Sequence, residues 1–309
     1  MSGPVAILGG VIVNRAGWAT GSFLAYVGAL IALIAAVAWL SVIDSERSQG
    51  AVAGWSVLFW VIAEVLAFAL LGRGRRVVGG LFGFVGLGLF ALMVGLFFSW
   101  FGWLPHDKPL GGFHLGLLLL ELLVLIAAAI DLSIFKFPLF VLVLAGLGWY
   151  FVTDLVSSGG NWSAWVTLFI GLFLFVMGLG NDGGDTRPYG FWVHVVAGLT
   201  IFGALLYWWH SSDFQWALII IVGLVFMAIG AGIKRSSYSV IGTVGLVLAT
   251  WHYALGGSPT NRFIGAGEEP PSTTPASWAG PVAFLCLGLF LVLVGMILWR
   301  RDVNGPETV

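Results

Sequence analysis

The sequence has 309 residues, of which 60% are hydrophobic and 9% are charged, and its formal net charge is −1 at pH 7. This apolar content is higher than a soluble fold requires, so a soluble protein is excluded. A net charge near zero argues against a nucleic-acid partner. Because Cys286 is the only cysteine, an intrachain disulfide is excluded.

The dominant pattern along the chain is a series of long apolar runs. A helix that crosses a bilayer needs about 20 mostly apolar residues. Ten runs meet this requirement, at residues 19–43, 51–71, 77–99, 113–131, 138–156, 162–180, 190–210, 213–232, 237–256 and 277–299. The sequence therefore predicts an all-α integral membrane protein with about ten transmembrane helices.

The remaining segments define four divisions of the chain. The apolar stretch Pro4–Val13 is too short to span and lacks a basic region before it, so we expect residues 1–18 to form an interfacial segment rather than a signal peptide. A nine-helix transmembrane core would cover residues 19–256. Residues 257–276 form an outer loop rich in Pro, Gly, Ser and Thr, and residues 277–309 hold the last helix and a short cytoplasmic tail.

The distribution of basic residues predicts the orientation in the membrane. With the N-terminus inside, ten of the 13 Lys and Arg residues lie on the inner side: Arg15, Arg73, Arg75, Arg76, Lys136, Arg187, Lys234, Arg235, Arg300 and Arg301. The positive-inside rule then places both termini in the cytoplasm. We expect a bacterial-type cytoplasmic membrane as the location.

A weak internal repeat connects the two-helix hairpins. Ala145–Leu147 is echoed by Ala197–Leu199, a shift of 52 residues. Each unit has an even number of spans, so the copies would be parallel. Chance alignment of Leu/Gly/Val-rich helices is the alternative.

Glycine is abundant, at 45 residues, and several pairs lie seven residues apart within one run. Gly79, Gly83 and Gly86 form one small-residue stripe. Such stripes let helix backbones approach closely in a membrane, so we interpret them as packing surfaces.

Two carboxylates, Glu64 and Glu121, lie well inside the predicted spans. An ionised side chain there costs about 2.5–3.5 kcal/mol on insertion scales, so both are candidates for a proton or ion path. His114 lies two helical turns before Glu121 on the same face and would serve as the proton entry. The alternative is a protonated glutamic acid that bonds to a neighbouring helix.

Histidine and aspartate residues gather at the outer helix ends. Zinc and other transition metals bind such side chains, and two histidines at similar depth can also bracket a haem. The candidates are His210, His252, Asp213 and Asp154. Their spacing is not diagnostic, and histidines that bond to headgroups or water are the alternative. We therefore predict no cofactor, while a metal or haem stays open.

Tryptophan is concentrated on the outer side, where all but Trp18, Trp60, Trp192 and Trp299 fall. The outer aromatic surface that we predict comprises Trp100, Trp103, Trp162, Trp165, Trp208, Trp209 and Trp216. Indole rings prefer the headgroup level, so anchoring is one interpretation, and a stacking platform for a ligand or lipid is the other.

On the inner side, basic residues cluster in two turns. Arg73, Arg75, Arg76, Lys234 and Arg235 are positioned to attract anionic lipid, although topology alone also explains them.

No nucleotide-binding or hydrolase motif is present, which favours a protein that is not an enzyme. Because few polar groups line the spans, our first hypothesis is a non-catalytic accessory or scaffold subunit whose aromatic outer face docks a membrane partner or lipid. The alternative is a ten-helix transporter for a small or lipophilic solute, proton-coupled through Glu64 and Glu121. A second alternative is a His-ligated cofactor or metal protein. Expected partners are membrane lipids and other membrane subunits.

Overall fold

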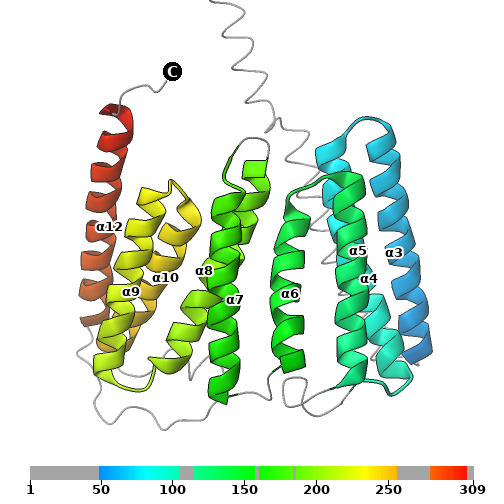
Figure 1. The fold of residues 1–309 in the computed structure, drawn as a ribbon, viewed down its shortest axis with the longest axis horizontal. Helices are drawn as coiled ribbons and strands as arrows, with labels where there is room; N and C mark the ends of the chain where they lie inside the picture. The colour runs from blue at the N-terminus through cyan, green and yellow to red at the C-terminus, as the bar shows by residue number, and fades with distance from the viewer. Residues whose placement is uncertain (1–48, 105–113, 157–159, 184–185, 256–278, 305–309) are drawn as a thin grey trace, which may run out of the picture. The chain divides into compact units, whose positions relative to one another are not determined.

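The computed structural model describes residues 49–104, 114–156, 160–183, 186–255 and 279–304 (Figure 1). The regular secondary structure in these ranges is helical. The predicted interfacial segment 1–18, the run 19–43 and the outer loop 257–276 lie outside the described residues.

Nine helices make up the described part of the chain. They are α3 (Gln49–Gly72), α4 (Arg76–Trp100), α5 (Leu115–Phe135), α6 (Leu139–Val156), α7 (Gly160–Gly180), α8 (Arg187–Trp208), α9 (Asp213–Gly232), α10 (Ser236–Leu255) and α12 (Ala279–Asn304). Each predicted run from residue 51 onward corresponds to one of these helices, with ends that differ by a few residues.

Eight of the described helices are long and apolar enough to cross a membrane. Helix α10 has serine and tyrosine at its start and threonine, histidine and tyrosine near its end. Large apolar side chains such as Val65, Phe169 and Phe173 are more than 60% exposed, as expected where a helix faces lipid rather than water.

The first unit of the chain extends to Ser158. Within it, α3 packs on α4, α4 on α5, and α5 on α6, and successive helices run antiparallel (Figure 1). Its buried core contains Leu87, Val124, Phe135 and Phe140.

The second unit begins at Gly159. The hairpins α7–α8 and α9–α10 are each closely packed, and α10 also contacts α8 and α12. The buried core contains Phe202, Trp216, Phe226, Tyr238 and Ile241, so most of it lies around α10.

Glycines allow this packing. A Cβ on Gly223 of α9 would lie 2.8 Å from the carbonyl oxygen of Gly242 on α10, so the two backbones touch where a side chain would separate them. In α4, Gly79 faces the backbone of α3, and Gly83 faces the Phe135 ring.

The turns that close α3–α4 and α9–α10 share one local geometry. Arg75 N–H donates to the Leu70 carbonyl, and Arg235 N–H donates to the Gly230 carbonyl, each five residues back. The residue before each donor is left-handed, Gly74 with φ 76° and Lys234 with φ 55°. This is the Schellman type of helix end, in which a left-handed residue lets the chain reverse immediately.

Candidate functional site

Glu64 has a carboxyl neighbour inside the first unit. Glu64 and Asp131 line one cavity of about 290 Å³ between α3, α4 and α5, with Trp60, Phe68 and Phe90. The two carboxyl groups interact electrostatically, and the Trp60 indole, which can only donate, hydrogen-bonds to Glu64. The Glu64 carboxyl packs against Gly86, where any larger residue would collide with it.

Glu121 has a different carboxyl neighbour. Glu121 on α5 and Asp154 on α6 interact electrostatically, and the Tyr150 hydroxyl is near both. Glu121 is only 2% exposed. Among the described residues, neither of its carboxyl oxygens has a hydrogen-bond partner, and Oδ2 of Asp154 is also buried without one. A buried polar atom without a partner calls for an explanation such as a proton or an ion.

His114 lies at the residue before α5, at the end of the helix nearer to Glu121. Its interaction is with Asp154. The sequence paired His114 with Glu121 along one helix, and the structure places Asp154, from α6, in the same neighbourhood.

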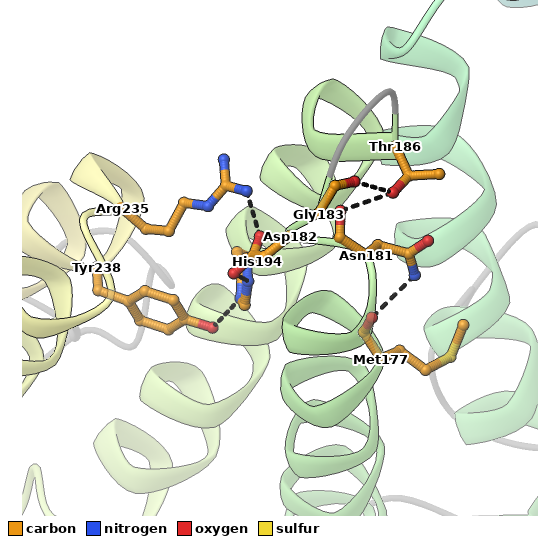
Figure 2. Close-up of polar contacts among 8 residues, drawn as sticks. All are labelled: Met177, Asn181, Asp182, Gly183, Thr186, His194, Arg235 and Tyr238. Carbon is orange, nitrogen blue, oxygen red and sulfur yellow. Dashed lines mark hydrogen bonds and ion pairs between the residues drawn. The ribbon is translucent and has the colours of Figure 1, made fainter. Parts of the chain in front are cut away.

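A second polar cluster lies in the second unit and was absent from the sequence candidates as a group (Figure 2). His194 of α8 is completely buried. Its Nδ1 lies 2.9 Å from the Tyr238 hydroxyl, and its Nε2 lies 3.1 Å from Oδ2 of Asp182. The other oxygen of Asp182, Oδ1, accepts a hydrogen bond from the Arg235 guanidinium.

These contacts determine where the hydrogen atoms of the cluster lie. A carboxylate oxygen only accepts, so Nε2 of His194 carries the hydrogen that faces Asp182. In the neutral ring, Nδ1 then accepts from the Tyr238 O–H. Each of the four side chains bonds to another member of the cluster, so the network ties α8 and the turn after α7 to the start of α10.

The local sequence makes room for this network. A Cβ on Gly178 would lie 2.6 Å from the His194 ring, so only glycine fits at this position of α7. Phe175 meets both the His194 and Tyr238 rings edge-on, at centroid distances of 5.9 and 5.7 Å. The Thr186 hydroxyl donates to the Asn181 and Gly183 carbonyls and so holds the turn that carries Asp182 (Figure 2).

The histidines proposed as metal or haem ligands have protein contacts. His252 Nε2 lies 2.9 Å from Oδ1 of Asp213, and the His252 ring stacks on Trp216 at 4.8 Å. Nδ1 of His210 lies 2.8 Å from the Tyr207 carbonyl. Among the described residues, no group of three or more His, Cys, Asp or Glu side chains is placed to hold a metal ion.

The predicted aromatic residues differ in exposure. Trp100, Trp103, Trp162 and Trp165 are about half exposed, and Trp165 packs on Trp208 with ring centroids 4.6 Å apart. Trp216 is instead fully buried, with its indole N–H donating to the His210 carbonyl.

The basic residues that we predicted to attract anionic lipid also differ in exposure. Arg73, Arg75, Arg76 and Lys234 are exposed, whereas Arg235 is buried against Asp182.

Sequence reasoning missed Asp131 and His194 as site residues. Asp131 fell on the last residue of a predicted run, but α5 continues to Phe135 and brings it into the span. His194 was the one histidine away from the outer helix ends. A histidine inside an apolar run was the available signal, since such residues are rarely placed there without a partner.

Comparisons with models of protein families, with curated proteins and with solved structures found no match. The described architecture therefore defines the class by itself: an all-helical protein with at least eight membrane-length apolar helices.

Proposed function

We propose that the protein is a transporter for a small lipophilic solute, with Glu64 as the essential carboxyl group. The observation that carries this proposal is the cavity between α3, α4 and α5, which combines two carboxyl groups with aromatic rings. A cavity inside membrane-spanning helices gives a solute a place to leave the lipid without entering water.

The lining of the cavity favours a solute with an apolar body and a positive charge. Trp60, Phe68 and Phe90 supply aromatic surface, and the face of an aromatic ring attracts a cation. Glu64 and Asp131 supply negative charge, and no basic side chain is among the described residues that line the cavity. Proton coupling follows if Glu64 carries a proton in the absence of the solute.

The test is uptake of tetraphenylphosphonium, a permanently charged lipophilic cation, into proteoliposomes with an imposed pH gradient. We expect Glu64→Gln to reduce uptake at least tenfold, to the level of protein-free vesicles, because the neutral amide neither pairs with a cation nor exchanges a proton. Ser133→Ala on α5 is the matched control, since the Ser133 hydroxyl is exposed, donates to the Ile130 carbonyl and is not among the groups that line the cavity. Full uptake by Glu64→Gln would refute the proposal.

The orientation that goes with this proposal is the one that the charge pattern favours, with both termini in the cytoplasm of a bacterial-type cell. The exposed Arg73, Arg75, Arg76 and Lys234 would then meet anionic lipid on the inner face.

An accessory subunit is the second candidate function, and the exposed aromatic rings favour it. Trp100 stacks on Phe101 at 5.4 Å, next to Trp103, and all three rings are about half exposed. Such rings suit a docking surface for a membrane partner. Native mass spectrometry of the gently solubilised protein tests this function: a stoichiometric protein partner supports it, and a lone monomer or homodimer refutes it.

A further inference from the structure

The pair formed by Glu121 and Asp154 has hydrogen-bonding capacity that the described residues do not fill. Glu121 is 2% exposed, and both of its carboxyl oxygens are buried without a partner in the described part of the chain. Oδ2 of Asp154 is in the same condition. The two groups interact electrostatically across the contact between α5 and α6.

Two ionised carboxylates in this position would be strongly unfavourable. A buried charge without a hydrogen bond or counterion carries a large desolvation cost, and like charges in proximity add to it. Since the partner groups are carboxyls, neither can donate to the other unless one is protonated.

The surrounding described elements do not supply a compensating charge at Glu121. Helix α4 has no titratable residue after Arg76, which lies at the end of α4 away from Glu121. The only titratable residues of α6 are Tyr150 and Asp154 itself. Of the titratable groups on or beside α5, Asp131 is acidic and lies beyond Glu121, Lys136 follows the end of α5 away from Glu121, and His114 interacts with Asp154.

We propose that Glu121 and Asp154 together hold one exchangeable monovalent cation, either a proton or Na⁺. A proton converts one carboxyl group into a donor for the other, and Na⁺ takes the unpartnered oxygens as ligands. Either cation reduces the charge of the pair by one unit and binds the oxygens for which the described residues supply no partner. This site goes beyond the proposed transport function, because cation binding is measurable without any solute.

The experiment uses the purified full-length protein in detergent and has two arms. In the first, the unfolding temperature is measured while NaCl replaces choline chloride at constant ionic strength. A ligand that binds the folded state raises this temperature with its concentration. In the second arm, difference infrared spectra follow the carbonyl stretch of protonated carboxylic acids as pH rises in the absence of Na⁺.

We expect one of two results. A rise in unfolding temperature specific to Na⁺ identifies a sodium site. A protonated carboxyl that persists to neutral pH and is lost at higher pH, without a sodium effect, identifies a proton site. Either signal must disappear in Glu121→Gln and in Asp154→Asn. The infrared spectra of all proteins are recorded in a Glu64→Gln, Asp131→Asn background so that the other carboxyl pair does not contribute. The signal must remain in Ser133→Ala, which changes an exposed side chain of the same helix.

If Glu121→Gln does not fold, Asp154→Asn alone tests the cation site. Asp154 is the less buried partner, so its replacement disturbs the fold less. The proposal is overturned if both arms are flat in the native protein, or if the signal survives in Asp154→Asn. A flat result in both arms together with intact tetraphenylphosphonium uptake would remove this site and leave the transport function standing.

Discussion

Two groups of buried polar side chains in the described residues differ in how far their hydrogen-bonding capacity is filled. His194, Asp182, Arg235 and Tyr238 each bond to another member of their cluster. Both carboxyl oxygens of Glu121 and Oδ2 of Asp154 are buried without a partner among the described residues. A filled network rigidifies the fold, whereas an unfilled pair has capacity left for a ligand. We therefore assign a structural role to the first group and a binding role to the second.

The structural role predicts a graded loss of stability. Tyr238→Phe leaves Nδ1 of the buried His194 without its donor, which costs about 1–3 kcal/mol. Asp182→Asn costs more, about 3 kcal/mol, since it leaves the Arg235 charge without its counterion; this is the lower end of the usual range because Asp182 is a quarter exposed. The measurement is the free energy of unfolding of the detergent-solubilised protein.

The same variants separate structure from function. If the network is structural, folded Tyr238→Phe transports tetraphenylphosphonium at the native rate. Loss of transport with unchanged unfolding would contradict the structural role and make His194 part of a proton path.

The sequence predicted individual site residues only where depth inside an apolar run was enough to single them out. Glu64 and Glu121 were recognisable because a carboxylate deep in an apolar run is rare. Their neighbours Asp131 and Asp154 lie near helix ends, where a carboxylate is ordinary. The hydrogen bond between His194 and Tyr238 could not be predicted from the sequence either, because the two residues are 44 positions apart and only tertiary packing brings them together.

Close helix packing in both units depends on glycine. Gly171 and Gly178 of α7 face α8, and Gly223 and Gly230 of α9 face α10, so each hairpin has two close contacts seven residues apart. In contrast, Gly88, Gly203 and Gly288 have no neighbour near a Cβ position. The spacing of glycines in the sequence therefore predicts packing only when the correct helix face is known.

This difference gives a paired prediction. Gly223→Ala forces α9 away from the Gly242 backbone and should destabilise the protein by about 1–3 kcal/mol. Gly203→Ala, in the second half of α8 with open space around the Cβ position, should be neutral or stabilising by up to about 1 kcal/mol because alanine is the better helix former. Unfolding of both variants under one set of conditions checks the prediction, and equal effects would contradict it.

The sequence predicted directly which segments form helices, but it predicted the ends of these helices less accurately. Apolar runs long enough to span are unambiguous. The ends are set by local contacts: the Ser212 hydroxyl accepts from Gln215 N–H at the start of α9, for example, and the Gln215 side chain accepts from Ser211. Lys136 and Lys234 end or follow helices in left-handed conformations that composition does not indicate.

The whole molecule has one native cysteine in 309 residues, which makes its topology directly testable. Cys286 is exposed on α12, and its replacement by serine gives a background without thiols. In this background, the predicted orientation places Ser211→Cys outside and Lys234→Cys inside.

A membrane-impermeant maleimide applied to intact cells should therefore label Ser211→Cys fully and Lys234→Cys only after lysis. Both residues lie in short turns at opposite ends of α9, so reactivity differs through sidedness rather than burial. Labelling of Lys234→Cys in intact cells and of Ser211→Cys only after lysis would show that the topology is the reverse of the predicted one. Labelling of both variants in intact cells would show that α9 does not cross the membrane.

The short connection between α9 and α10 has a consequence for biosynthesis. Only Ile233, Lys234 and Arg235 separate the two helices, and their backbones touch at Gly223 and Gly242. A nascent α10 therefore meets α9 as soon as it is made, and the translocon would release the two helices as a single hairpin. Helix α12, made last, would then pack on an α10 that is already in contact with α9 and α8.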